Sequence, residues 1–191
     1  MCAVNLSAAR NNTRIDCSTI GGEVLNSELV AAEKFHELDI DAFMQRNGRE
    51  QREHEIFECA RALRRELGFA KVGAVGYCYG GWASFRLGAR EHRLEGGGRL
   101  VDCISVGHPS LLSRRDVDEV DVPVQVLAPE VDLAFDVEFK RYAFETLLGL
   151  NVAFEYRHFP RVGHGCLARG MGRGRRWWGK WMRLLRGLDG G

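Results

Sequence analysis

The stretch KVGAVGYCYGG, residues 71–81, joins a short apolar run to a cysteine that has glycines on both sides. The run Lys71–Gly76 is typical of a fully buried strand, and the segment from Gly80 to Ala89 is typical of a helix. Gly76 and Gly80, two residues before and after Cys78, permit a sharp turn between this strand and this helix, because side chains at the two positions would collide with the neighbouring strand and helix. This junction predicts a sheet of the α/β type.

The same alternation of strands and helices continues along the chain. Short apolar runs predict buried strands, and apolar residues at three- and four-residue steps predict helices. A mostly parallel sheet flanked by helices accommodates such an alternation. The predicted strands are Leu100–Val106, Val122–Ala128 and Val152–Phe159, and the predicted helices are Glu50–Leu67 and Asp136–Leu148.

Composition narrows the class of protein further. The chain has 191 residues, which favours one principal domain, and a formal net charge of +1, which does not favour nucleic acid or an anionic membrane as its partner. No apolar window is long enough for a membrane span, and the N-terminus lacks the pattern of a secretion signal. We therefore expect a cytoplasmic protein whose six cysteines are free thiols.

The turn around Cys78 has the G-x-nucleophile-x-G form of a nucleophile elbow, between a strand and a helix. It places Cys78 at a helix N-terminus, where the helix dipole favours the thiolate over the thiol. The backbone N–H of Tyr79 would point to the place where an oxyanion forms. A buried cysteine in a glycine-rich turn is the alternative interpretation of this motif.

Two later residues fit as partners of Cys78, in the order nucleophile, acid, base that α/β-hydrolases share. Asp132 follows the strand Val122–Ala128, and the carboxyl ends of parallel strands are where such sheets hold their ligands. His164 lies in a glycine-flanked loop after the last strand, from which its imidazole can reach Cys78. Asp132 would hold that imidazole in the useful tautomer.

Other residues compete for these roles. Glu130 and Asp136 lie near Asp132, but loop carboxylates are often merely solvated, and Asp136 suits a helix cap better. His108 is the serious competitor of His164 as base, although we expect it in the lining of the substrate pocket instead. The side chains expected in that lining are Tyr77, Tyr79, Trp82 and His108.

Four segments of the chain together resemble the dienelactone hydrolase family: VGYCYGG at 75–81, HPS at 108–110, APEVD at 128–132 and GHGCLARG at 163–170. The resemblance covers roughly residues 38 to 170. It implies an α/β-hydrolase fold and hydrolysis of an ester or lactone in a small molecule, without a cofactor or metal. By motif position it implies a triad of Cys78, Asp132 and His164.

The resemblance is strongest to fungal members, some of which serve natural-product pathways, so a role in secondary metabolism is suggested. Arg169 lies one place from where members carry a carboxylate-binding arginine, which adds it to the expected pocket. Residues 1–37 do not resemble the family's N-terminal strands, which supply an oxyanion-hole N–H and a glutamate that contacts the nucleophile. We therefore expect those strands to be missing, and a catalytically impaired member acting as a binding or regulatory protein is the alternative function.

The chain is expected to divide into an atypical N-terminal segment, residues 1–37, a family-like α/β domain, residues 38–170, and a tail, residues 171–191. From Arg169 to Arg186 there are seven basic residues and no acidic one. Tryptophans and leucines of the tail fall on one helical face, which favours a closing helix with solvated arginines. The alternative interpretation is a basic, aromatic surface for nucleic acid or anionic lipid.

Overall fold

The computed structural model describes residues 3–10, 13–18, 37 and 39–167. The described strands are β1 (Ala3–Arg10), β2 (Thr13–Ser18), β3 (Lys71–Tyr77), β4 (Cys103–Gly107), β5 (Val124–Val131) and β6 (Phe154–Gly163). The described helices are α2 (Ile40–Asn47), α3 (Arg49–Arg65), α4 (Gly80–Leu87), the 3-10 helix η2 (Arg90–His92), α5 (Arg114–Asp118) and α6 (Val137–Gly149).

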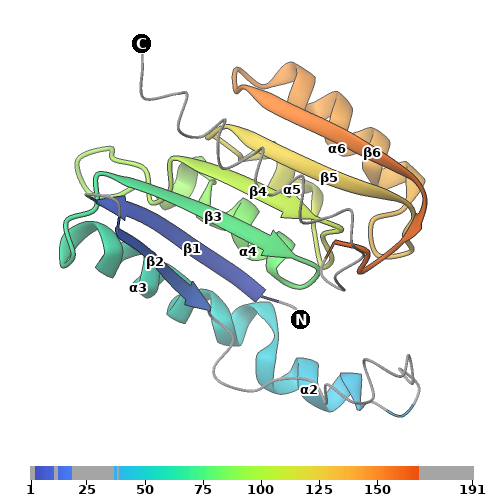
Figure 1. The fold of residues 1–191 in the computed structure, drawn as a ribbon, viewed down its shortest axis with the longest axis horizontal. Helices are drawn as coiled ribbons and strands as arrows, with labels where there is room; N and C mark the ends of the chain where they lie inside the picture. The colour runs from blue at the N-terminus through green and yellow to red at the C-terminus, as the bar shows by residue number, and fades with distance from the viewer. Residues whose placement is uncertain (1–2, 11–12, 19–36, 38, 168–191) are drawn as a thin grey trace.

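All six strands belong to one sheet with the order β2-β1-β3-β4-β5-β6 (Figure 1). The strands β3, β4, β5 and β6 run parallel to one another, whereas β1 pairs antiparallel with both β2 and β3. The mostly parallel sheet flanked by helices that the sequence predicts is therefore confirmed. Its parallel strands all end at the same edge, where their following loops meet.

The structure places two strands in the N-terminal segment, for which the sequence pattern predicts none: β1 and β2 form a hairpin on the edge of the parallel sheet. The register of β1 against β3 pairs Ala3 with Tyr77 and Ala9 with Lys71, so the pairing runs along the whole of β3. Apolar alternation is weak in these two strands, which is why the sequence pattern did not reveal them. The expected boundaries at residues 37 and 170 stay predictions.

The helices α3 and α4 pack on the sheet and lie behind it in Figure 1. All residues of α4 are buried, and this helix contacts β1, β3 and β4. The buried residues of α3 recur at helical spacing, as the sequence predicts, and join α4 and the sheet in one hydrophobic core. The residues that α3 buries are Ile56, Phe57, Ala60 and Leu63.

The last described helix, α6, begins with the cap that the sequence predicts. The Asp136 carboxylate accepts the backbone N–H of Phe139 at 2.7 Å. Among the described residues, no helix has both the length and the apolar character that crossing a membrane requires. The predicted closing helix of the tail lies outside the described residues, as does Arg169.

Candidate active site

The pairing of β3 with β4 brings Cys78 and His108 together. Tyr77 lies opposite Gly107 in the parallel register, so the residues that follow them leave the sheet side by side. The Cys78 N–H donates a hydrogen bond to the Gly107 carbonyl at 3.1 Å. Both Cys78 and His108 have a positive φ, 52° and 38°, which is uncommon outside glycine and concentrates at functional sites.

The glycines around Cys78 allow its turn to be as tight as it is. A Cβ atom on Gly76 would lie 2.0 Å from the carbonyl oxygen of Gly80, the first residue of α4. A Cβ atom on Gly81 would lie 2.3 Å from the Cβ of Pro109, in the loop after β4. The strand–turn–helix geometry predicted from the glycine pattern is therefore present, with Cys78 at its tip.

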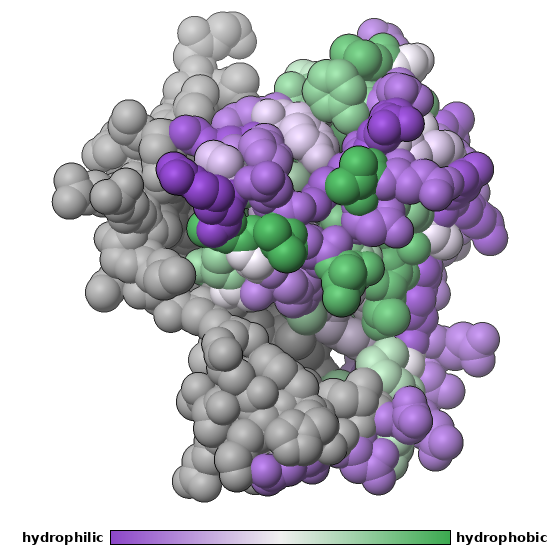
Figure 2. Space-filling model, turned by 90° about the vertical axis from the view of Figure 1, so that its right-hand side faces the viewer, coloured by the Kyte–Doolittle hydropathy of each residue, from purple (hydrophilic) through white to green (hydrophobic). Residues whose placement is uncertain are grey.

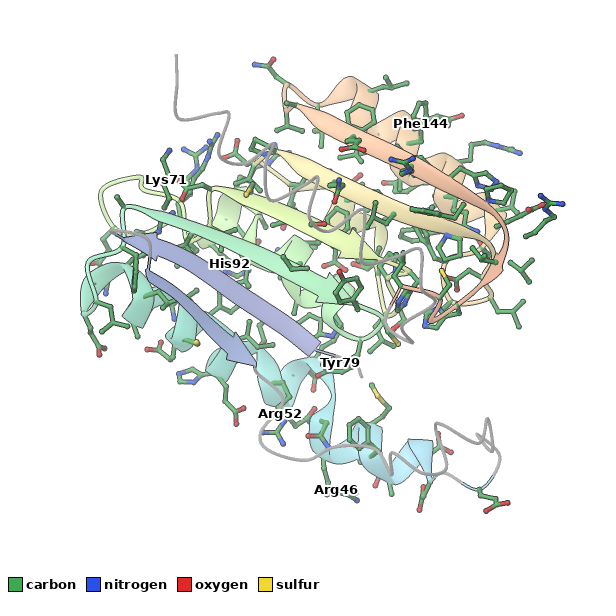
Figure 3. The ribbon with its side chains drawn as sticks, in the orientation of Figure 1. Arg46, Arg52, Lys71, Tyr79, His92 and Phe144 are labelled. Atoms are coloured by element: carbon green, nitrogen blue, oxygen red, sulfur yellow. The ribbon has the colours of Figure 1, made fainter. Side chains whose placement is uncertain are left out.

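Tyr79 follows Cys78 and is the N-cap residue of α4. Its hydroxyl donates a hydrogen bond to the Asn47 carbonyl of α2, and Figure 3 shows it between the end of β3 and that helix. Burial raises the pKa of Tyr79 to about 12. The side chain of Tyr79 therefore holds α2 in place, and only the backbone of Tyr79 remains available to the site.

The structure corrects the expectation that Trp82 lines the substrate pocket. Trp82 is fully buried, its ring packs edge-on against Tyr79 with centroids 5.6 Å apart, and the Arg49 guanidinium lies 5.1 Å from its centroid. Because α4 is covered on all sides, an indole on this helix becomes part of the core.

The pairing of β5 with β6 sets Asp132 beside His164. Along most of the two strands, paired residues are 30 positions apart, but at their end Val131 faces Gly163, 32 positions further on. The His164 N–H donates to the Val131 carbonyl at 3.1 Å. With the regular spacing Asp132 would face Val162, so the irregularity is what aligns the carboxylate with the imidazole.

This irregularity involves Arg161, which has a φ of 60° in the left-handed region. The backbone N–H of Arg161 donates to the Glu130 carboxylate at 2.6 Å. Glu130, one of the two rivals of Asp132, therefore supports the backbone of β6. Asp136, the other rival, caps α6.

The carboxylate of Asp132 holds the His164 ring. Its Oδ1 lies 2.9 Å from His164 Nδ1 and also accepts the backbone N–H groups of Ala134 and Phe135 at 3.0 and 3.1 Å. Asp132 is 6% exposed, and this burial alone would raise its pKa. The hydrogen bond and charge of His164, together with the two backbone donors, outweigh burial and lower the pKa below its ordinary value.

His108 completes the cluster. One side-chain ligand atom from each of Cys78, His108 and His164 lies within 4.8 Å of the other two. The two imidazole rings meet edge to face with centroids 4.7 Å apart, and the Tyr77 ring lies 5.8 Å from that of His108. His108 is only 1% exposed, and neither of its ring nitrogens has a hydrogen-bond partner within the described part of the chain.

Burial, and then the charge of nearby His164, lowers the pKa of His108 from 6.5 to about 4. Between these pH values the unfolded chain binds a proton at this residue and the folded chain does not, so the free energy of unfolding should fall on acidification through this range. The expected loss is on the order of 3 kcal/mol. Urea unfolding at neutral and mildly acidic pH measures it. The free energy of unfolding of a His108→Gln variant should fall clearly less over the same pH range. An equal fall in both proteins would contradict the lowered pKa of His108.

Sequence reasoning missed one neighbour of the thiol, Ser110. Its Oγ lies 3.8 Å from Cys78 Sγ, and its backbone N–H donates to the Cys78 carbonyl at 2.9 Å. The segment HPS carried the signal, because polar residues that directly follow a parallel strand lie at the edge of the sheet where ligands bind.

The rim of this edge is apolar in part. Figure 2 views the molecule from the side toward which the arrows of β3 and β4 point in Figure 1. On this side, hydrophobic side chains, in green, are interspersed with hydrophilic ones, in purple. Val131 and Leu133, on either side of Asp132, are 64% and 97% exposed. Leu111 in the loop after β4 and Val137 at the start of α6 are exposed as well.

A mostly parallel sheet with a nucleophile elbow at its carboxyl edge defines the α/β-hydrolase class of fold. Within that class, the sequence model of the dienelactone hydrolase family matches residues 35–175, and the chain belongs to this family.

Individual relatives agree with this assignment. Hydrolase pyvD of Aspergillus violaceofuscus is 33% identical over 110 residues, which cover 57% of this chain and 41% of that protein. The structure of a dienelactone hydrolase-like promiscuous phosphotriesterase from metagenomic libraries matches with a TM-score of 0.62 and 16% identity. The match covers 92% of this chain and 74% of the phosphotriesterase chain. The structure of esterase 2 of Thermogutta terrifontis matches with a TM-score of 0.61 and 16% identity, and the match covers 73% of this chain and 65% of the esterase chain. The two structures confirm the fold, and the chain spans less than half the length of pyvD.

Proposed function

We propose that the protein hydrolyses an ester or lactone bond of a small molecule, with Cys78 as nucleophile, His164 as base and Asp132 as the residue that orients His164. One observation carries the proposal: a single imidazole lies 2.9 Å from a buried carboxylate and presents a nitrogen within 4.8 Å of an elbow thiol. Nucleophilic catalysis requires this sequence of contacts. Membership of a hydrolase family supports it independently.

The choice of His164 over His108 as base follows from their surroundings. His164 has a carboxylate partner, which fixes the Nδ1–H tautomer and leaves Nε2 to accept the thiol proton. His108 has no hydrogen-bonded carboxylate within the described residues, and its pKa of about 4 makes it a poor proton acceptor at neutral pH. We therefore assign proton transfer to His164 and leave His108 as a neutral neighbour of the reacting atoms.

The proposed reaction has two halves. His164 takes the proton of Cys78, the thiolate attacks the substrate carbonyl, and the leaving alkoxide or enolate takes that proton back from His164. Water, activated by the same imidazole, then hydrolyses the thioester and regenerates the thiol. We assign stabilisation of the oxyanion in both halves to the backbone N–H of Tyr79, the N-cap residue of α4.

The substrate class follows from the rim and the relatives. Exposed Val131 and Leu133 beside Asp132 favour a substrate with an apolar portion and do not favour a polyanion such as nucleic acid. A role in secondary metabolism, which the resemblance to fungal members suggests, is part of this proposal.

Replacing Asp132 with asparagine is expected to lower the kcat for p-nitrophenyl acetate and for small enol lactones by about 10²–10⁴-fold. An amide cannot hold the Nδ1–H tautomer of His164 as a carboxylate does. Initial rates with the purified protein measure the effect, and His158→Gln, an exposed histidine on β6, is the matched control with unchanged rates. Equal activity of Asp132→Asn and the unmodified chain would rule out the proposed triad.

The second candidate function is a family member that binds without turnover. It would be favoured if the purified chain hydrolysed none of these esters or lactones while iodoacetamide still labelled Cys78. The rate of that labelling across pH separates the two candidates further. A nucleophile activated by His164 should react well below the ordinary thiol pKa of about 8.5.

A further inference from the structure

The group of Cys78, His108 and His164 has the chemistry of a metal site as well as that of a hydrolase. One thiol and two imidazoles are the ligand types that zinc prefers in proteins. His108 gives the strongest indication: it is 99% buried, and among the described residues neither of its ring nitrogens has a hydrogen-bond partner, which is rare for a buried polar side chain. From these residues we propose that the elbow binds a thiophilic divalent cation, represented by Zn²⁺, through Cys78 Sγ and one nitrogen each of His108 and His164.

The distances fit after a small movement of side chains. With Zn–S near 2.3 Å and Zn–N near 2.0–2.1 Å, tetrahedral ligand atoms lie about 3.5 Å apart. The three ligand atoms here lie within 4.8 Å of one another, so each pair has to approach by about 1.3 Å at most. Rotation about the side-chain bonds of Cys78 and His164, both only partly buried, provides that movement without a change in the backbone.

Charge and hydrogen bonding complete the site. A thiolate at Cys78 and the buried carboxylate of Asp132 together carry two negative charges, which a divalent cation balances. Because His164 Nδ1 faces Asp132, Nε2 is the nitrogen left for the cation. Carboxylate–imidazole–zinc is the usual outer-shell arrangement of zinc sites, and it orients the ligand nitrogen. The fourth position would remain for water.

Binding would switch off the nucleophile. The cation forms a bond to the sulfur of Cys78, and the thiol proton passes to solvent, as Zn²⁺ ligation of cysteine requires. His164 then has no free nitrogen with which to accept a proton. The inference goes beyond the proposed hydrolysis and does not depend on it, because the same ligands would hold Zn²⁺ in a chain without turnover.

Titration with Co²⁺, a spectroscopic substitute for Zn²⁺, tests the site directly in the full chain. A thiolate–cobalt charge-transfer band in the near ultraviolet should appear and be displaced by Zn²⁺ but not by Mg²⁺, which prefers oxygen ligands. Cys78→Ser should abolish the band. His108→Gln should weaken Zn²⁺ binding at least about tenfold, the effect that even an outer-shell loss produces.

Two controls keep the result specific to this cluster. Cys103→Ala removes the β4 thiol, whose pKa burial raises to about 11, and His158→Gln removes an exposed imidazole. Both variants should bind Zn²⁺ as the unmodified chain does. A band that persists in Cys78→Ser, or unchanged Zn²⁺ affinity in a folded His108→Gln variant, would overturn the proposal.

A second measurement needs no variant. Zn²⁺ should slow alkylation of Cys78 by iodoacetamide at least about tenfold, followed by mass spectrometry of the labelled peptide, whereas Mg²⁺ should not. Equal alkylation rates with and without Zn²⁺ would also contradict the site. Absence of ester turnover, in contrast, would contradict the proposed hydrolysis and leave these binding results unaffected.

Discussion

Turnover of p-nitrophenyl acetate is expected to fall by at least about 10³-fold when Cys78 is replaced with alanine, because the variant keeps the elbow and the Asp132–His164 pair but lacks the proposed nucleophile. The remaining rate would reflect binding and the oxyanion donor alone. Initial rates measured with chelator present give the comparison, and the proposed mechanism predicts a thioester on Cys78 of the unmodified chain that mass spectrometry should detect.

The matched control for this experiment is Cys103→Ala. Cys103 lies on β4, and burial raises the pKa of its thiol to about 11, so at neutral pH it is protonated and a poor nucleophile. We expect the turnover rate of the Cys103→Ala variant to lie within about twofold of that of the unmodified chain. Wild-type turnover by Cys78→Ala would disprove the nucleophile assignment, and acyl groups found on another cysteine would show which thiol reacts instead.

Replacing Gly76 with alanine is expected to reduce the free energy of unfolding by more than about 3 kcal/mol. The new Cβ would lie 2.0 Å from the Gly80 carbonyl oxygen and 2.5 Å from Ser84 Oγ. The serine can rotate, but the carbonyl belongs to the backbone of α4 and cannot move without displacing the buried helix from the sheet. Urea unfolding followed by circular dichroism measures the change.

Gly149→Ala is the matched substitution at a place without obstruction. Apart from its chain neighbours and the backbone of α6, no atom of the described residues lies within 4 Å of a Cβ built on Gly149, the last residue of α6. Because alanine is the better helix former, we expect stability to be unchanged or to rise by up to about 1 kcal/mol. If both variants shifted the unfolding midpoint downward to the same extent, the steric account of the elbow would be wrong.

Much of the parallel sheet could be predicted from the sequence because its strands are continuous apolar runs. The elbow was readable for a related reason: glycines at 76, 80 and 81 surround a possible nucleophile, and such spacing has few structural uses. The cap of α6 at Asp136 was also predictable, since capping depends on a residue and its near neighbours alone.

Other features depend on contacts that no local pattern records. The alignment of Asp132 with His164 requires two extra residues in β6, and only the pairing with β5 reveals them. Trp82 looked like a pocket residue because it follows the elbow, but its place is set by the burial of α4 on all sides. The strand β1 is stabilised by its pairing with β3, which is remote in sequence, so its own weak alternation gave no signal.

The contact between Gly81 and Pro109 has a consequence for how the site could be adjusted. Gly81 belongs to the helix that starts behind the thiol, and Pro109 follows His108 directly, so this contact, together with the backbone hydrogen bonds of Cys78 to Gly107 and Ser110, sets how closely the two loops approach. A methyl group added at position 81 would act as a wedge between them. The gap between sulfur and imidazole could thereby be widened while every reactive group stayed chemically unaltered, which makes position 81 a spacer for tuning reactivity.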